Sequence, residues 1–253
     1  MCDPCSKVSV TRLPVSGGRR WVVAALLSSV AVASIGCASQ SRVVFEPGQL
    51  DEAIASLTLP LPGNFAALYD LRVARSGGLR LAVVTAGDEG RMTISQPFGA
   101  AVSLTAWTAH GPTIFFDMDL GCRREVDDLE EVLGVGSLPL GQAVRLLGGR
   151  LPVMPGDSVE IGADGNIEVH GVGWAAQHRL APSPWRVVEV SELRSDGAAG
   201  WHLELSSHTS SVPGTIRLEN PDGRWAELEL KRLEWPGEAS LPDLPAFPPC
   251  AGW

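Results

Sequence analysis

Alternating apolar and polar residues dominate the chain from Phe65 to His110. Each short run places its apolar side chains on one face, as half-buried antiparallel strands do. Turn-forming residues separate the runs at 76–78, 87–90 and 97–99. The pattern predicts five strands, centred on Leu71 and Val73, on Leu79, Leu81 and Val83, on Met92 and Ile94, on Val102, Leu104 and Ala106, and on residues 113–116.

A second set of alternating segments follows Pro155. Asp164-Gly165 between two of them is typical of a hairpin turn, and Asn220-Pro221-Asp222-Gly223 predicts another turn with its proline at the second position. The pattern predicts six more strands, centred on Val159 and Ile161, on Ile167 and Val169, on Val188 and Val190, on Trp201, Leu203 and Leu205, on Ile216 and Leu218, and on Ala226, Leu228 and Leu230.

Three segments have helical rather than strand periodicity. Residues 49–57 form a short amphipathic pattern that Pro60 ends. Residues 125–133 and 140–148 follow the first five strands, and each has one apolar face. The apolar positions of these two segments include Val126, Leu129, Leu133, Val144 and Leu147.

These elements predict a mainly β protein without βαβ alternation. About ten or eleven antiparallel strands with one helical insertion favour an incomplete antiparallel β-barrel. The two inserted helices must bury their apolar faces, so we expect them to form a short lid over the open mouth or concave face of the sheet. The barrel domain is predicted to span residues 49–235, followed by a Pro-rich, extended tail at 236–253.

The N-terminal segment differs from the rest of the chain. Four basic residues precede an uninterrupted run of apolar and small residues at 21–36, which predicts a signal peptide at 1–36. Ser34-Ile35-Gly36-Cys37 resembles the lipobox of bacterial lipoproteins, although leucine is usual where Ser34 stands. The resemblance implies that Cys37 carries a lipid and that residues 37–48 form a tether. Because Ala38 rather than an aspartate follows the cysteine, the resemblance also implies sorting to the outer membrane. Cleavage after Ala33 is the alternative, which leaves no lipid anchor.

The charge balance argues against nucleic acid as a partner. Residues 1–36 contain four Lys or Arg and one acidic residue, so the rest has 20 − 4 = 16 basic and 29 − 1 = 28 acidic side chains, a net charge of 16 − 28 = −12. No apolar run after residue 37 approaches the roughly 20 residues of a membrane-spanning helix. Cys122 and Cys250 remain as one pair, either as a disulfide or as two thiols.

The sequence contains no catalytic motif. The five histidines lack the spacing of a metal site, and the carboxylates at 127–128 and 130–131, like Asp117 and Asp119, are typical of a solvated surface. We therefore expect no enzyme, no cofactor and no metal. The eight tryptophans fill a core or line an apolar cavity. Pro97 and Gly99 predict a tight loop that presents Phe98 at its tip, and an exposed aromatic there is a contact residue.

The order of several motifs resembles LolB, the outer-membrane receptor for lipoproteins, over residues 65–235. The motifs are Gln96-Pro97-Phe98-Gly99, then a strand and a short acidic helix, Leu138-Pro139-Leu140, Leu147-Gly148-Gly149-Arg150-Leu151-Pro152, and the closing hairpin at 213–235. The cysteine pair, the Pro-rich tail and the short first helix depart from the family, so the chain resembles a divergent member. The resemblance implies the LolA/LolB lipoprotein-localisation fold.

The resemblance also implies a function. Acyl chains of lipoproteins, delivered by a periplasmic LolA-like carrier, would enter an apolar cavity under the lid and be inserted into outer-membrane lipid beside Pro97, Phe98 and Gly99. Other readings are a structural or assembly lipoprotein that binds protein partners through strand edges, and a lipoprotein that binds another lipid cargo. The expected cavity lining is Leu81, Val83, Met92, Ile94, Leu104, Trp107, Leu203 and Leu228.

Overall fold

A computed structural model describes residues 45, 48–61, 63–74, 77–87, 89–108, 111–162, 165–238, 241 and 243–251. The chain divides into two units, 1–43 and 44–253, and every described residue belongs to the second. The predicted signal peptide, Cys37 and most of the predicted tether therefore lie outside the described residues, as does His110. No described helix is long and apolar enough to cross a membrane.

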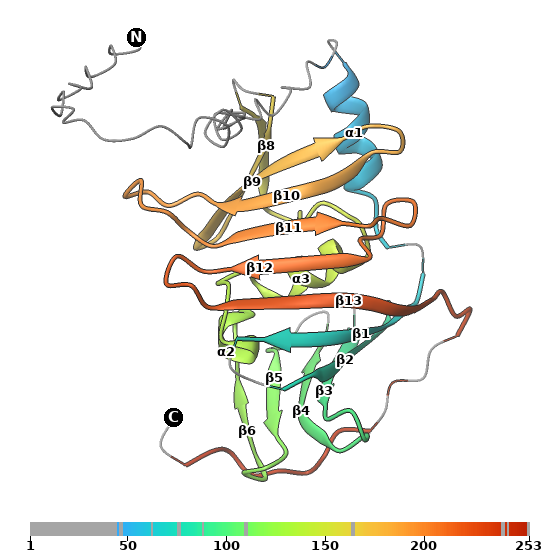
Figure 1. The fold of residues 1–253 in the computed structure, drawn as a ribbon, viewed down its shortest axis with the longest axis vertical. Helices are drawn as coiled ribbons and strands as arrows, with labels where there is room; N and C mark the ends of the chain where they lie inside the picture. Colours follow the sequence, from blue (N-terminus) through green and yellow to red (C-terminus); the bar gives the residue numbers. More distant parts are fainter. Residues whose placement is uncertain are drawn as a thin grey trace, which may run out of the picture. The chain divides into compact units, whose positions relative to one another are not determined.

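The described residues form one antiparallel sheet of 13 strands (Figure 1). Its order is β6-β5-β4-β3-β2-β1-β13-β12-β11-β10-β9-β8-β7. The sheet stays open because β6 and β7, at its two ends, do not pair with each other. This confirms the mainly β, incomplete barrel. The strands are β1 (Phe65–Val73), β2 (Leu79–Ala86), β3 (Glu89–Ser95), β4 (Ala101–Trp107), β5 (Ile114–Asp117), β6 (Cys122–Glu125), β7 (Ser158–Ile161), β8 (Ile167–Gly171), β9 (Trp174–Ala181), β10 (Arg186–Glu192), β11 (His202–Ser206), β12 (Thr215–Glu219) and β13 (Trp225–Glu234).

Two of the 13 strands, β6 and β9, were not predicted from the alternation. The four residues of β6 contain two arginines and a glutamate, and none of them is fully buried. In β9 the buried positions are Ala176, His178 and Leu180, of which only the last is a large apolar residue. A pattern of large apolar residues therefore does not reveal either strand.

One face of the sheet carries the main core. On β1 the inward side chains are Phe65, Ala67, Tyr69 and Leu71, all at most 6% exposed, and the residues between them are more exposed. Burying a large apolar side chain contributes about 1.5–3 kcal/mol, so this alternation fixes which face of β1 turns inward. The same alternation continues through β11, β12 and β13.

Three short helices accompany the sheet: α1 (Gln49–Leu57), α2 (Glu130–Leu133) and α3 (Leu140–Leu147). The predicted helix at 125–133 is wrong in length, because only its last four residues are helical. Two backbone hydrogen bonds, from Val126 N to Thr113 O and from Leu129 N to Leu138 O, tie the residues before it to neighbouring segments. Pairing with neighbouring segments thus outweighs helical periodicity in this stretch.

Arg145 fastens α1 to α3. Its guanidinium donates to the carbonyl oxygens of Thr58 (2.9 Å) and Leu59 (3.2 Å), which follow the end of α1, and to that of Leu151 (2.9 Å), which follows α3. A cation at this end also complements the dipole of α1. The arrangement fixes α3 against the end of α1.

The C-terminal segment runs beside the β6 edge of the sheet (Figure 1). A disulfide joins Cys122 to Cys250, and Arg123 exchanges backbone hydrogen bonds with Pro248 and Cys250. Phe247 packs on Phe116, in a small apolar cluster apart from the main core. The segment therefore covers this edge and the apolar side chains beside it.

Candidate functional site

An apolar slot lies between the sheet and the two helices α2 and α3. Its floor comes from β2, β3, β11, β12 and β13, and its roof from the segment 129–147, which we call the lid. All its lining side chains are aliphatic or methionine, so the side chains that line the described slot provide no hydrogen-bond donor or charged group for a polar ligand. They are Leu81, Met92, Leu129, Leu133, Leu138, Leu140, Ala143, Val144, Leu146, Leu147, Leu203, Ile216, Leu218, Ala226 and Leu228.

The slot is nearly closed. It holds about 40 Å³ of free space. A water molecule needs about 10–15 Å³ measured this way, so the slot has room for about three waters and not for a long chain. A ligand with an extended apolar part can enter only if the lid moves away from the sheet.

Polar contacts fasten the lid to turns of the sheet. Arg224, after the β12–β13 turn, donates to Gly134 O (2.6 Å) and to Glu130 Oε1 (3.0 Å). In the same turn, Asn220 Oδ1 accepts a bond from the Gly136 backbone N–H (2.9 Å). The contacts of Arg224 are on the surface, where salt and water compete with them. They can therefore be exchanged for water when the lid opens.

A buried aromatic makes a second attachment. The Trp201 indole N–H on the sheet donates to the Ser137 hydroxyl of the lid (3.1 Å), and that hydroxyl donates to Glu192 Oε1 (3.3 Å). Trp201 is 4% exposed, so its indole N–H would lack a partner if Ser137 moved away without water entering. Opening the lid at this point requires hydration of the indole.

An open groove adjoins the slot. It has a volume of about 500 Å³, and both spaces are bounded by Leu133 of α2. This volume lies within the roughly 300–1,000 Å³ range of ligand pockets. The groove is lined by Leu71, Val73, Leu79, Ile94, Val102, Ser103, Phe115, Asp117, Asp119, Leu120, Val132 and Leu133.

Five of the eight side chains predicted to line a cavity line one of the two described spaces. Leu81, Met92, Leu203 and Leu228 line the slot, and Ile94 lines the groove. Val83 is fully buried in the same core without forming a wall of either space. Of the predicted lid residues, Leu129, Leu133, Val144 and Leu147 line the slot, whereas Val126 is buried outside it.

The prediction was wrong for Leu104. A register shift between Ile94 and Ser95 pairs Ile94 with Ser103, which places Ser103 on the inner face and turns Leu104 outward. Leu104 packs instead with Ala106 and Phe116 in the small cluster that Phe247 covers.

Trp107 also lines neither space. Its ring lies over Gly90 on the neighbouring strand, so close that a Cβ added to that glycine would be 2.0 Å from the ring. The ring packs against the main core. Among the described residues, no tryptophan lines the slot or the groove, so the described tryptophans fill core or surface positions.

The loop at 96–100 presents Phe98 as expected, with 98% of its surface exposed. Backbone bonds from Gln96 N to Ala100 O and from Gly99 N to Gln96 O close the loop, and Gly99 has a φ of 95° that favours glycine. Val102 and Asp117, at the same end of β4 and β5, line the groove. Phe98 therefore projects at the end of the sheet where the groove opens.

Sequence reasoning missed several residues of both spaces. Leu138, Leu146, Ile216 and Leu218 complete the slot, and Leu120 stands at the groove with 70% of its surface exposed. Ile216 and Leu218 were predicted as inward strand residues, so their alternation could have placed them in the lining. Leu120 lies in a turn, where apolar periodicity gives no signal.

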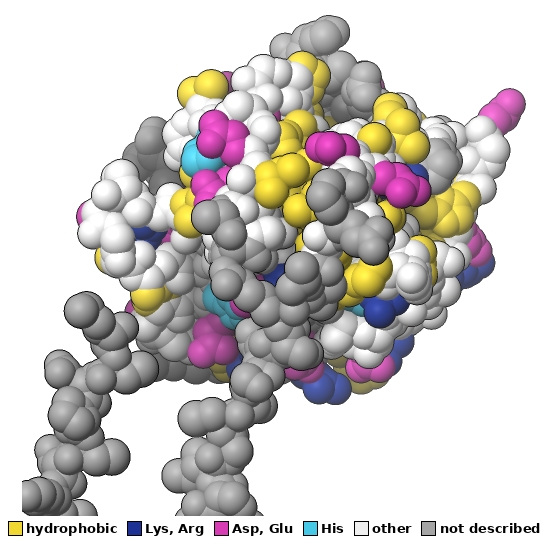
Figure 2. Space-filling view, turned by 90° about the horizontal axis from the view of Figure 1, so that it is seen from above, with side chains coloured by type: hydrophobic (Ala, Val, Ile, Leu, Met, Phe, Trp, Pro, Cys, Tyr) yellow, Lys and Arg dark blue, Asp and Glu magenta, His cyan; other side chains and the backbone are white. Residues whose placement is uncertain are grey.

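Surface charge is distributed unevenly on the face shown in Figure 2. Acidic side chains lie among the hydrophobic ones there, and Lys and Arg lie mostly toward its margin. On the lid, the Glu131 carboxylate accepts a hydrogen bond from Arg124 (2.6 Å), and just before the lid Asp128 Oδ1 accepts one from the Glu131 backbone N–H (3.2 Å). These two carboxylates make hydrogen bonds that stabilise the start of α2.

Comparisons with known proteins bear on the fold. No protein-family model and no curated protein matches the sequence. A solved domain described as that of an outer-membrane lipoprotein-sorting protein from Vibrio parahaemolyticus is similar, with 12% identity, 76% of this chain and 93% of that chain covered, and a TM-score of 0.51. A LolA superfamily protein from Nitrosomonas europaea gives 12% identity, 77% and 92% coverage, and a TM-score of 0.49. At these identities the likeness shows the fold alone, and the chain shares the fold of the Vibrio parahaemolyticus domain.

Proposed function

We propose that this protein is a lipid-anchored receptor of the outer membrane that takes up the acyl chains of lipoproteins and passes the lipoproteins into that membrane. The observation that carries the proposal is the slot, whose fifteen described lining residues are all apolar and whose roof is a short, separately fastened lid. Such a space can bind hydrocarbon and little else. The solved domain with a similar fold is described as part of an outer-membrane lipoprotein-sorting protein, which supports the same function.

Binding would proceed without covalent chemistry. Each methylene moved from water into the opened slot contributes about 0.8 kcal/mol, which offsets the cost of separating the lid from the sheet. The closed slot keeps fifteen apolar side chains out of water when no cargo is present. Lid opening therefore sets the balance between uptake and release.

Release would occur at the end of the sheet where Phe98 projects. A ring with 98% of its surface exposed gains free energy by entering the interfacial region of a bilayer. Contact there would bring the groove close to the membrane, so that a chain could leave the protein without crossing water. Delivery by a periplasmic LolA-like carrier would precede this step.

The anchor on Cys37 is part of the proposal and is tested separately. An alkyne-tagged fatty acid supplied to cells should label the full-length protein and not the Cys37→Ser variant. Cleavage after Ala33 instead would leave the mature protein unlabelled, and the protein would then be a soluble shuttle.

Uptake is tested by titrating the protein with a fluorescent fatty acid. Leu203→Gln, in the floor of the slot, should weaken binding at least about ten-fold, since it places a polar amide in an apolar space. Val172→Gln is the matched control, because Val172 is fully exposed in a turn. Circular dichroism checks that both variants are folded. If the wild-type protein binds no fatty acid, the proposal fails.

Membrane transfer is tested with the same ligand and acceptor vesicles. Phe98→Glu should slow transfer without changing the affinity for the fatty acid, whereas Val172→Glu should leave both unchanged. Normal transfer by Phe98→Glu would remove Phe98 from the proposed mechanism.

A further inference from the structure

The groove beside the slot has a chemical character of its own. Nine of its twelve lining side chains are apolar, and they come from β1, β2, β3, β4, α2 and the β5–β6 hairpin. Phe115 and Ile94 line it together with Leu133, which also bounds the slot. The groove can therefore hold a hydrocarbon chain that continues toward the slot.

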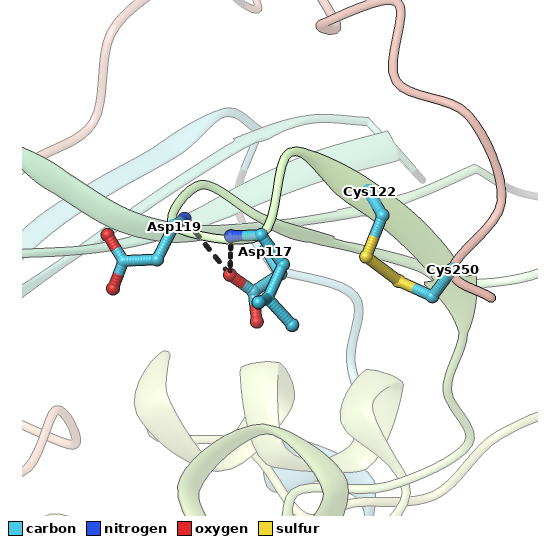
Figure 3. The surroundings of a disulfide bond; sticks show 5 residues. Asp117, Asp119, Cys122 and Cys250 are labelled. Atoms are coloured by element: carbon cyan, nitrogen blue, oxygen red, sulfur yellow. Dashed lines mark hydrogen bonds between the residues drawn. A yellow bond between two sulfur atoms is a disulfide. The ribbon is translucent and has the colours of Figure 1, made fainter. Parts of the chain in front are cut away.

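Two carboxylates stand at this groove, and both belong to the β5–β6 hairpin. Asp117 Oδ1 accepts the backbone N–H groups of Asp119 (3.0 Å) and Leu120 (2.9 Å), which fixes the turn (Figure 3). The disulfide of Cys122 lies just beyond the turn in the same view. Asp117 and Asp119 are thus held on a tightly bonded turn.

Neither carboxylate is neutralised by a neighbouring cation. Within the described part of the chain, neither Asp117 nor Asp119 forms an ion pair, and the groove lining contains no Lys, Arg or His. Arg124 lies over the Phe115 ring at 5.0 Å, but it pairs with Glu131 at 2.6 Å. The charge available to a ligand in this groove is therefore negative.

We propose that the groove binds the acyl chain of an amphiphile whose head group is a cation, with the ammonium placed at Asp117 and Asp119. An ammonium group donates hydrogen bonds that carboxylates accept, and its charge complements theirs. The apolar chain would lie along Ile94 and Phe115 toward Leu133. This inference rests on the proposed function, because it assigns a head-group preference to the same acyl-binding region.

The test compares three dodecyl compounds by calorimetry with the full-length protein: dodecylammonium, the neutral dodecanol and dodecyl sulfate, each below its micelle concentration. Dodecylammonium should bind most tightly and dodecyl sulfate least. An exposed ion pair is worth up to about 1 kcal/mol, or about five-fold in affinity. The double variant Asp117→Asn, Asp119→Asn should therefore bind dodecylammonium about five- to thirty-fold more weakly, and its affinity for dodecanol should be unchanged.

Two controls isolate the effect of the carboxylates. Asparagine retains the oxygen that accepts the turn hydrogen bonds, so the β5–β6 hairpin should keep its structure. Asp51→Asn with Glu52→Gln removes the same charge from exposed positions on α1, and should change none of the three affinities. Added salt should reduce the preference for dodecylammonium in the wild-type protein only.

The outcomes separate this inference from the proposed function. If dodecanol binds but dodecylammonium and dodecyl sulfate bind equally well, the head-group preference is overturned and acyl binding stands. The same holds if the Asp117→Asn, Asp119→Asn variant keeps the full preference. If none of the three compounds binds, both proposals fail.

Discussion

Lowering the pH should destabilise this protein through His178 on β9. The side chain is completely buried, its Nδ1 lies 3.3 Å from the Ile167 carbonyl oxygen, and its Nε2 has no described partner. Burial lowers the pKa of His178 from 6.5 to about 4, because the charged imidazolium would lose its hydration. The folded protein therefore holds this side chain neutral.

The direction and size of the effect follow from this difference in pKa. The unfolded chain binds a proton near pH 6.5, whereas the folded protein does so only near pH 4. The contribution of His178 to stability is present in full above pH 6.5 and is lost as the pH falls toward 4. At about 1.36 kcal/mol per pKa unit, the difference of about 2.5 units gives a loss of about 3 kcal/mol.

Urea denaturation measures this loss. We expect the free energy of unfolding of the wild-type protein to fall by about 3 kcal/mol more than that of His178→Leu between about pH 7.5 and about pH 4. Both proteins contain the same carboxylates, so the titration of carboxylates does not contribute to the difference between them. His170→Gln, at a partly exposed position on β8, is the control and should follow the wild type. Equal pH dependence in wild type and His178→Leu would refute the reasoning.

Three further predictions concern the lid and its supports. Arg224→Ala removes two bonds to the lid, so a fluorescent fatty acid should bind more tightly, and added salt should tighten binding to the wild type but not to the variant. Cys250→Ser removes the disulfide to Cys122, whose two cysteines are 128 positions apart in the sequence. The free energy of unfolding measured in urea should therefore fall by up to about 5 kcal/mol. Arg145→Met loses bonds to the carbonyls of Thr58 and Leu151, and should lower the melting temperature with a cost of about 2–4 kcal/mol. An unchanged affinity, unfolding free energy or melting temperature, respectively, would contradict each prediction.

Most of the sheet could be predicted because its strands are half buried. Strands such as β1, β2 and β12 alternate large apolar residues with polar ones, and that pattern is visible without a structure. The strand β9 could not be found this way, since His178 and Ala176 occupy buried positions there. Burial of a neutral histidine depends on its surroundings in the folded protein, which the pattern does not contain.

The site was predicted in part for a related reason. Alternation identified Leu203 and Leu228 as inward residues, but it placed Leu104 on the wrong face. One extra residue at the β3–β4 register shift reverses the face of the residues that follow, and no local signal in the sequence marks it. The acidic groove was missed because tertiary structure sets the neighbours of Asp117, at the end of β5, and of Leu120, in the turn that follows.

Photo-crosslinking tests most directly whether acyl chains enter the space under the lid. A fatty acid that carries a diazirine at the end of its chain would be bound to the full-length protein, irradiated, and located by mass spectrometry of peptides. The account predicts crosslinks in the lid at 129–147 and on the inner faces of β11–β13. Crosslinks confined to the outer face around Leu104 and Phe116, or none above the level obtained with an excess of unlabelled fatty acid, would contradict it.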